Sequence, residues 1–142
     1  MSRPEIAPEI APETVSETGV FAALRELARE APVEVRVRGD CMAPLLADGA
    51  RVRVAAARLY WPGDVVVFRA ADGRLLAHRL LGYRLHAGAL ALVTRGDACA
   101  VHDAPVPLAR VLGRVAAASP GLAGRAAALG RFLALALRRL RA

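Results

Sequence analysis

The sequence predicts a mainly β protein: a coiled antiparallel sheet or partial barrel, with one helix before it and one amphipathic helix after it. Short apolar runs follow one another from residue 33 to about residue 115, separated by Gly-Asp or Asp-Gly pairs. Such pairs favour tight turns, and short strands joined by tight turns without alternating helices form antiparallel sheets. The chain has 142 residues, 56% of them hydrophobic, which is enough to bury a core.

The segment before the sheet divides into an arm and a helix. Residues 1–17 are rich in Pro and Glu, with a proline at every fourth position of 4–12. Proline blocks both helix and ladder hydrogen bonds, so we expect a disordered arm. Residues 18–31 carry apolar side chains at helical spacing, and Pro32 ends the predicted helix.

The body of the chain, residues 18–118 including that helix, is expected to form one domain. Its first strand shows the β pattern clearly, because Val33, Val35 and Val37 alternate with charged residues. The predicted strands cover residues 33–38, 50–54, 64–69, 74–83, 89–95 and 109–116.

The tail, residues 119–142, is predicted to be a basic amphipathic helix. Two interpretations stay open: the helix packs on the sheet or a partner helix, or it lies on an anionic membrane surface. A membrane-spanning helix is disfavoured, because Arg125 and Arg131 would lie in lipid. The apolar stripe consists of Leu122, Ala126, Leu129, Leu133, Leu137 and Leu140, with Arg131, Arg138, Arg139 and Arg141 mostly on the other face.

Charge is spread unevenly along the chain. All 20 basic residues are arginine, and the net charge is −4 over residues 1–34, +6 over 35–118 and +5 over 119–142. A basic surface suits nucleic acid or an anionic membrane. Because the chain has few aromatic stacking residues and no nucleic-acid motif, we expect no nucleic-acid partner.

Targeting signals and cysteines bear on the compartment. The N-terminus lacks a basic region followed by an apolar one, and no apolar run approaches the ~20 residues that span a bilayer. The two cysteines make no disulfide framework and fit a reducing compartment. The expected location is therefore cytoplasmic or peripheral to a membrane.

Residues 38–44 read R-G-D-C-M-A-P, where a predicted strand ends in a sharp turn. This heptapeptide resembles the nucleophile box of the signal peptidase I and LexA-type peptidase clan, roughly G-x-S-M-x-P, with Cys41 in place of the serine. The resemblance implies a coiled sheet of the LexA/signal peptidase type and a nucleophile at Cys41. It also implies oxyanion or substrate binding around Asp40, Met42 and Pro44, with the Cys41 N–H and one N–H of the preceding Gly39-Asp40 turn as oxyanion donors.

The base that activates Cys41 cannot be a lysine, because the sequence contains none. His78, in L-L-A-H-R-L-L, follows G-D-V-V-V-F by ten residues. This layout resembles the histidine-dependent branch of the clan, the endoplasmic-reticulum-type and archaeal signal peptidases. An imidazole with a pKa of ~6.5 can accept a proton near neutrality. The alternative is a structural histidine buried among leucines.

Residues 94–103, T-R-G-D-A-C-A-V-H-D, resemble a further box of the same branch, T-K-G-D-N-N-x-V-D-D. The resemblance makes Asp103 the first candidate to orient His78, with Asp97 the second. The alternative is that both aspartates only cap turns, and for Asp97 this is the favoured interpretation. Cys99 and His102 depart from the family pattern. The last predicted strand also resembles that of the family.

Three interpretations of Cys41 remain. It is the nucleophile of a Cys-His(-Asp) peptidase that cleaves an extended peptide or leader bound to a strand edge. Alternatively, the chain is an inactive relative that serves as a peptide-binding or membrane-surface adaptor. The third is a metal site, whose ligands would be Cys41, His78, Cys99 and His102, in spacings that match no zinc pattern. We expect the peptidase, without metal or cofactor.

Overall fold

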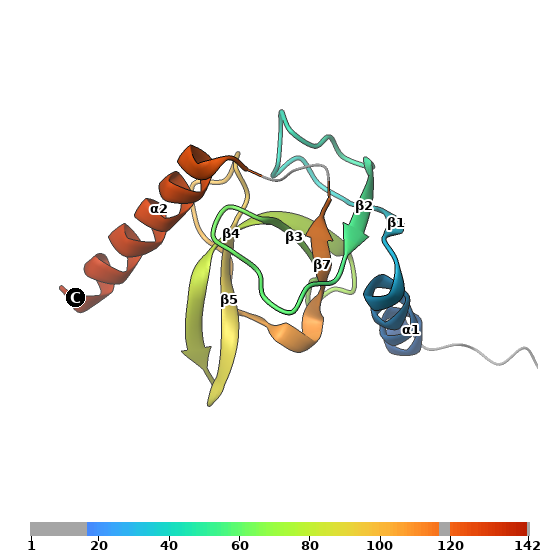
Figure 1. Ribbon diagram of the computed structural model, residues 1–142. Helices are drawn as coiled ribbons and strands as arrows, with labels where there is room; N and C mark the ends of the chain where they lie inside the picture. Colours follow the sequence, from blue (N-terminus) through green and yellow to red (C-terminus); the bar gives the residue numbers. More distant parts are fainter. Residues whose placement is uncertain (1–16, 117–119, 142) are drawn as a thin grey trace, which may run out of the picture.

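The structure, a computed structural model, describes residues 17–116 and 120–141. Of the predicted arm, residues 1–16 lie outside the described residues, and Glu17 already begins helix α1 (Glu17–Glu30). The second helix, α2 (Leu122–Leu140), lies at the opposite side of the molecule from α1 (Figure 1). Both helices were predicted within a few residues of these bounds.

Seven antiparallel strands form one curled half-barrel sheet, in the order β1-β2-β7-β3-β4-β5-β6 (Figure 1). Short turns join β3 to β4 and β4 to β5, as antiparallel pairing allows, whereas longer loops lead from β1 to β2 and from β5 to β6. The strands are β1 (Val33–Arg36), β2 (Arg51–Ala55), β3 (Val65–Arg69), β4 (Leu75–His86), β5 (Ala89–Arg95), β6 (Val106–Pro107) and β7 (Val111–Val115).

All six predicted strands are present, with ends displaced by a few residues. The sequence did not reveal β6, which is only two residues long, or the 3-10 turn η1 (Leu108–Arg110) that follows it. That turn explains why the last strand starts at Val111 and not at the predicted residue 109. Neither segment is long enough to show a period in its apolar residues.

The sheet buries apolar side chains on both faces. One cluster joins the valines of β1 and β2 to Val65, Val67 and Ala77, and is covered by α1. The other contains Val66, Phe68, Leu80 and neighbouring residues of β5 to β7. The V-V-V-F run of β3 therefore lies at the centre of the sheet with both faces covered, which holds the adjacent strand β4 in a fixed place.

Helix α2 packs on the sheet through a face different from the predicted leucine stripe. Ala128, Phe132 and Leu135 contact Leu81 and Val93 of β4 and β5. The close approach needs Gly82, since a Cβ at that position would lie 2.7 Å from the Phe132 ring. The predicted stripe is exposed instead, with Leu122, Leu129, Leu133, Leu137 and Leu140 between 44% and 89% accessible.

Candidate functional site

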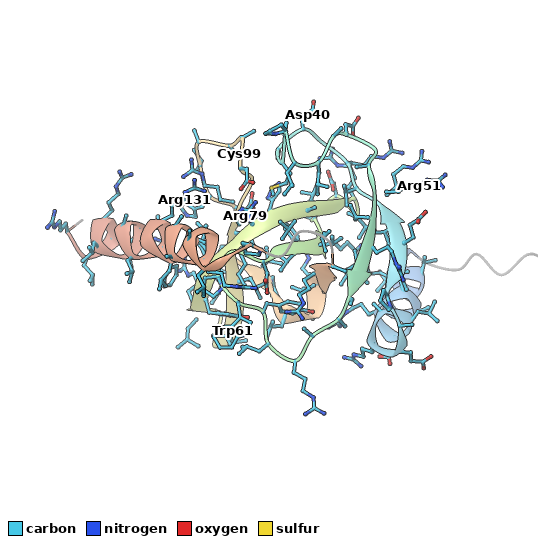
Figure 2. All side chains as sticks on the ribbon, turned by 45° about the horizontal axis from the view of Figure 1, so that its top comes forward. Asp40, Arg51, Trp61, Arg79, Cys99 and Arg131 are labelled. Atoms are coloured by element: carbon cyan, nitrogen blue, oxygen red, sulfur yellow. The ribbon has the colours of Figure 1, made fainter. Side chains whose placement is uncertain are left out.

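Cys41 lies in a tight loop that directly continues β1. The Val37 N–H still donates to the Ala50 carbonyl, as a strand residue would, and the chain then reverses at Gly39. Gly39 has φ of 92°, a conformation that only glycine adopts without strain, and its N–H donates to Asp48 Oδ1 at 2.8 Å. The loop leaves Cys41 half-buried and Asp40 at its outer end (Figure 2).

This loop is fastened to the segment that follows β5. The Ala98 N–H donates to the Cys41 carbonyl at 2.8 Å, and the Asp97 N–H donates to Met42 Sδ at 3.4 Å. Met42 itself is only 2% exposed and belongs to the core under α1. These contacts hold Cys41 beside the 96–99 loop, which carries Cys99 (Figure 2).

The residues predicted to bind the oxyanion or the substrate, Asp40, Met42 and Pro44, differ in their exposure to solvent. Asp40 and Pro44 are exposed, and the Ala43–Pro44 peptide bond is cis. The Met42 side chain points into the core, so it anchors the loop and leaves only its backbone for a substrate. The Gly39 N–H is already bound by Asp48, so of the preceding turn only the Asp40 N–H remains as an oxyanion donor with that of Cys41.

His78 occupies the middle of β4, opposite Val66 of β3. It is 4% exposed, and the Phe68 ring meets it edge-on at a centroid distance of 5.6 Å. The Phe68 side chain forms an apolar wall on one side of His78 and fixes the plane of the imidazole ring. The imidazole edges therefore face the polar groups that come from the neighbouring loops.

Asp103, and not Asp97, is the acid at the imidazole. The His78 Nδ1–H donates to Asp103 Oδ2 at 2.5 Å. Asp97 instead forms two hydrogen bonds of 2.7 Å with the Arg79 guanidinium, which points to the opposite side of β4. The alternation of a β-strand explains the difference, because successive residues face opposite sides.

Thr94 holds Asp103 in place. Its hydroxyl donates to Asp103 Oδ2 at 2.7 Å, and its carbonyl accepts the Asp103 N–H at 2.8 Å. Thr94 is fully buried on β5, opposite Leu80 of β4. The sequence prediction missed this residue, although a single hydroxyl ending the apolar run A-L-A-L-V-T was a signal for it, since buried hydroxyls require a hydrogen-bond partner.

The pKa values of the imidazole and of the two thiols are each shifted by neighbouring groups. Burial, the largest influence on His78, lowers its pKa, but the Asp103 hydrogen bond and charge, with contributions from Cys41, outweigh it and raise the pKa overall. Hydrogen bonds from Cys99 and then from His78 lower the pKa of Cys41. The pKa of Cys99 is raised, mainly by its hydrogen bond to Cys41.

The directions of these three pKa shifts indicate which groups keep their protons and which lose them. The lowered pKa of Cys41 and the raised pKa of His78 favour a thiolate–imidazolium pair, and the raised pKa of Cys99 makes it the weaker acid of the two thiols. Because Nδ1 is occupied by Asp103, we assign Nε2 as the nitrogen that faces Cys41. The arrangement provides a nucleophile, a proton carrier and an orienting carboxylate within one connected set.

A metal site finds no support in the geometry. Within residues 17–116 and 120–141, no three His, Cys, Asp or Glu side chains are placed to hold a metal ion. His102 contacts the Arg139 guanidinium on α2 through its Nε2, at 3.3 Å.

Comparison of the chain with protein families, with curated proteins and with solved structures gave no match.

Proposed function

We propose that this protein is a thiol peptidase of the signal peptidase I and LexA-type clan, in its histidine-dependent branch. The observation that carries the proposal is the connected set of Cys41, His78 and Asp103. The curled antiparallel half-barrel with a preceding helix is consistent with the clan's fold. The three residues come from three separate boxes of the sequence, which meet at one place.

In the proposed reaction the Cys41 thiolate attacks the carbonyl carbon of the scissile peptide bond. The N–H groups of Cys41 and Asp40 stabilise the negative charge on the carbonyl oxygen. The His78 imidazolium then gives its proton to the leaving amine, and a thioester remains on Cys41. Neutral His78 next takes a proton from water, which hydrolyses the thioester, while Asp103 keeps the ring oriented throughout.

The outer edge of β1 is the proposed binding surface for an extended peptide. Within the described part of the chain β1 pairs only with β2, through the register that places Val35 opposite Val52. Because the Val37 N–H donates toward β2, the backbone groups of Glu34 and Arg36 point the other way. On the same side the Arg38 N–H donates to the Leu75 carbonyl at 3.2 Å, so a peptide that pairs with this edge ends near Arg36, five residues before Cys41.

Cleavage of a peptide library tests the proposal. We expect the native protein to generate new N-termini from a proteome-derived peptide mixture, with small residues beside the cut, as in the clan. The Cys41→Ala variant should generate none, whereas Cys41→Ser should retain some cleavage. If native protein and Cys41→Ala give the same products, the peptidase assignment fails.

A second function, attachment to a membrane surface, is favoured by the exposed face of α2. In the described residues neither helix has the length and apolarity needed to cross a bilayer. Leu129, Leu133 and Leu137 recur at helical spacing and are each about half accessible or more, at 44%, 53% and 54%. Arginines flank this stripe along the helix, which suits the phosphate groups of an anionic lipid surface.

We expect the double substitution Leu133→Glu and Leu137→Glu to weaken binding to phosphatidylglycerol-containing vesicles by at least about tenfold, because it removes apolar area from the contact and adds repulsive charge. Co-sedimentation with vesicles measures it. The matched control is Val20→Glu with Leu27→Glu on α1, two similarly exposed apolar residues (54% and 55%) on the other side of the molecule. Equal effects of the two pairs, or no binding by the native protein, would exclude the surface role of α2.

A further inference from the structure

The two cysteines of the chain, 58 positions apart in the sequence, lie side by side. Each thiol shifts the pKa of the other, lowering that of Cys41 and raising that of Cys99. The backbone of Gly96 passes between them so closely that a Cβ there would lie 2.7 Å from the Cys41 Cβ and 2.8 Å from the Cys99 Sγ. The absence of a side chain at Gly96 thus leaves room for both cysteines beside it.

Backbone hydrogen bonds hold this pair in position. The Cys41 carbonyl accepts the Ala98 N–H at 2.8 Å, and the Cys99 N–H donates to the Gly96 carbonyl at 3.0 Å. The Arg95 guanidinium donates to the Cys99 carbonyl at 2.6 Å. Both cysteines are free thiols of intermediate exposure, so a small solute can reach them.

We propose that Cys41 and Cys99 are a peroxide-sensitive dithiol in which Cys99 resolves the oxidised form of Cys41 as an intramolecular disulfide. The function proposed above gives Cys99 no step of its own, and a nucleophilic thiolate that touches a second thiol is the arrangement of a reversible redox site. The oxidant is a hydroperoxide, either hydrogen peroxide or an organic one.

The chemistry balances in two steps. The Cys41 thiolate attacks the terminal oxygen of the hydroperoxide, the O–O bond breaks, and sulfenic acid forms while the leaving oxygen takes a proton. The Cys99 sulfur then attacks the Cys41 sulfur, the S–O bond breaks, and water leaves with the Cys99 proton. A dithiol reductant reverses the bond by thiol exchange. The disulfide blocks the nucleophile reversibly, a consequence that rests on the proposed peptidase function, whereas disulfide formation itself does not.

Intact-mass analysis of the whole chain after treatment with hydrogen peroxide tests the proposal. We expect the native protein to lose two hydrogen atoms, to resist iodoacetamide afterwards, and to recover both thiols with dithiothreitol. Peptide mapping should find Cys41 joined to Cys99 in the same chain. In Cys99→Ser and Cys99→Ala, Cys41 should instead gain oxygen irreversibly, about tenfold faster than in the native protein.

Two results would overturn the proposal. One is a native protein in which Cys41 gains oxygen irreversibly as fast as in Cys99→Ser. The other is a disulfide that joins two chains and none within a chain. If the variants do not fold, the intact mass and the peptide map of the peroxide-treated native protein decide between the proposal and these two results. If the Cys41–Cys99 disulfide forms as expected in a protein that cleaves no peptide, the dithiol proposal holds and only the peptidase assignment fails.

Discussion

Replacing His78 by alanine is expected to lower peptide cleavage by about 10²–10⁴-fold, the range typical of a lost general acid or base. In the proposed reaction, His78 both stabilises the Cys41 thiolate and supplies the proton for the leaving amine. Its loss should also move the pKa of Cys41 upward, because the hydrogen bond and charge of His78 lower that pKa in the native protein. Rates of cleavage measured against pH give both effects.

The matched control is His86→Ala, an exposed histidine at the far end of the same strand. It should leave cleavage and its pH dependence unchanged. Because His78 is buried, the variant's fold must be checked by its unfolding transition. A folded His78→Ala protein that still cleaves at the native rate would contradict the assigned role.

Asp103→Asn is expected to have the second largest effect, on the order of a thousandfold in cleavage, with the native shape preserved. Loss of the carboxylate charge leaves the burial of His78, which lowers the pKa of that histidine, opposed only by the smaller contributions of Cys41. The imidazolium is then lost at lower pH than in the native protein. The alkaline limb of the kcat/KM profile should therefore shift toward acid.

Asp97→Asn discriminates between the two aspartates of the same segment. Asp97 is paired with Arg79, and this pairing is the main reason its own pKa is lowered. We expect its substitution to leave the alkaline limb of the pH profile in place. A larger loss of activity in Asp97→Asn than in Asp103→Asn would mean that the acid has been assigned wrongly.

Much of the fold was predictable because its elements carry local signals. Glycine-containing turns mark the ends of the strands, and five of those glycines have positive φ: Gly39, Gly49, Gly63, Gly73 and Gly88, at 92°, 75°, 96°, 87° and 78°. The helical spacing of apolar residues likewise identified both helices. The face of α2 that packs on the sheet was not predictable, because two apolar stripes share that helix and tertiary contacts choose between them.

The site was predictable as a set of motifs, and less so as a set of contacts. Sequence resemblance marked Cys41, His78 and Asp103 in three separate boxes, and the structure brings them together. The resemblance left the role of Asp97 open, because the position of its partner Arg79 on β4 depends on the register of β4 with β5. The hydroxyl that ends the apolar run of β5 marked Thr94 as a residue that needs a partner, but the identity of that partner, Asp103, and the proximity of Cys41 to Cys99 are long-range consequences of folding that no local pattern contains.

The most direct test of the account is the rate at which iodoacetamide alkylates Cys41, followed by site-resolved mass spectrometry across pH. Only the thiolate reacts, so the inflection of the rate gives the pKa of Cys41. We expect an inflection below the value of about 8.5 for a free thiol, and a shift of that inflection to higher pH in His78→Ala. An inflection at about 8.5 in the native protein that His78→Ala leaves unchanged would contradict it.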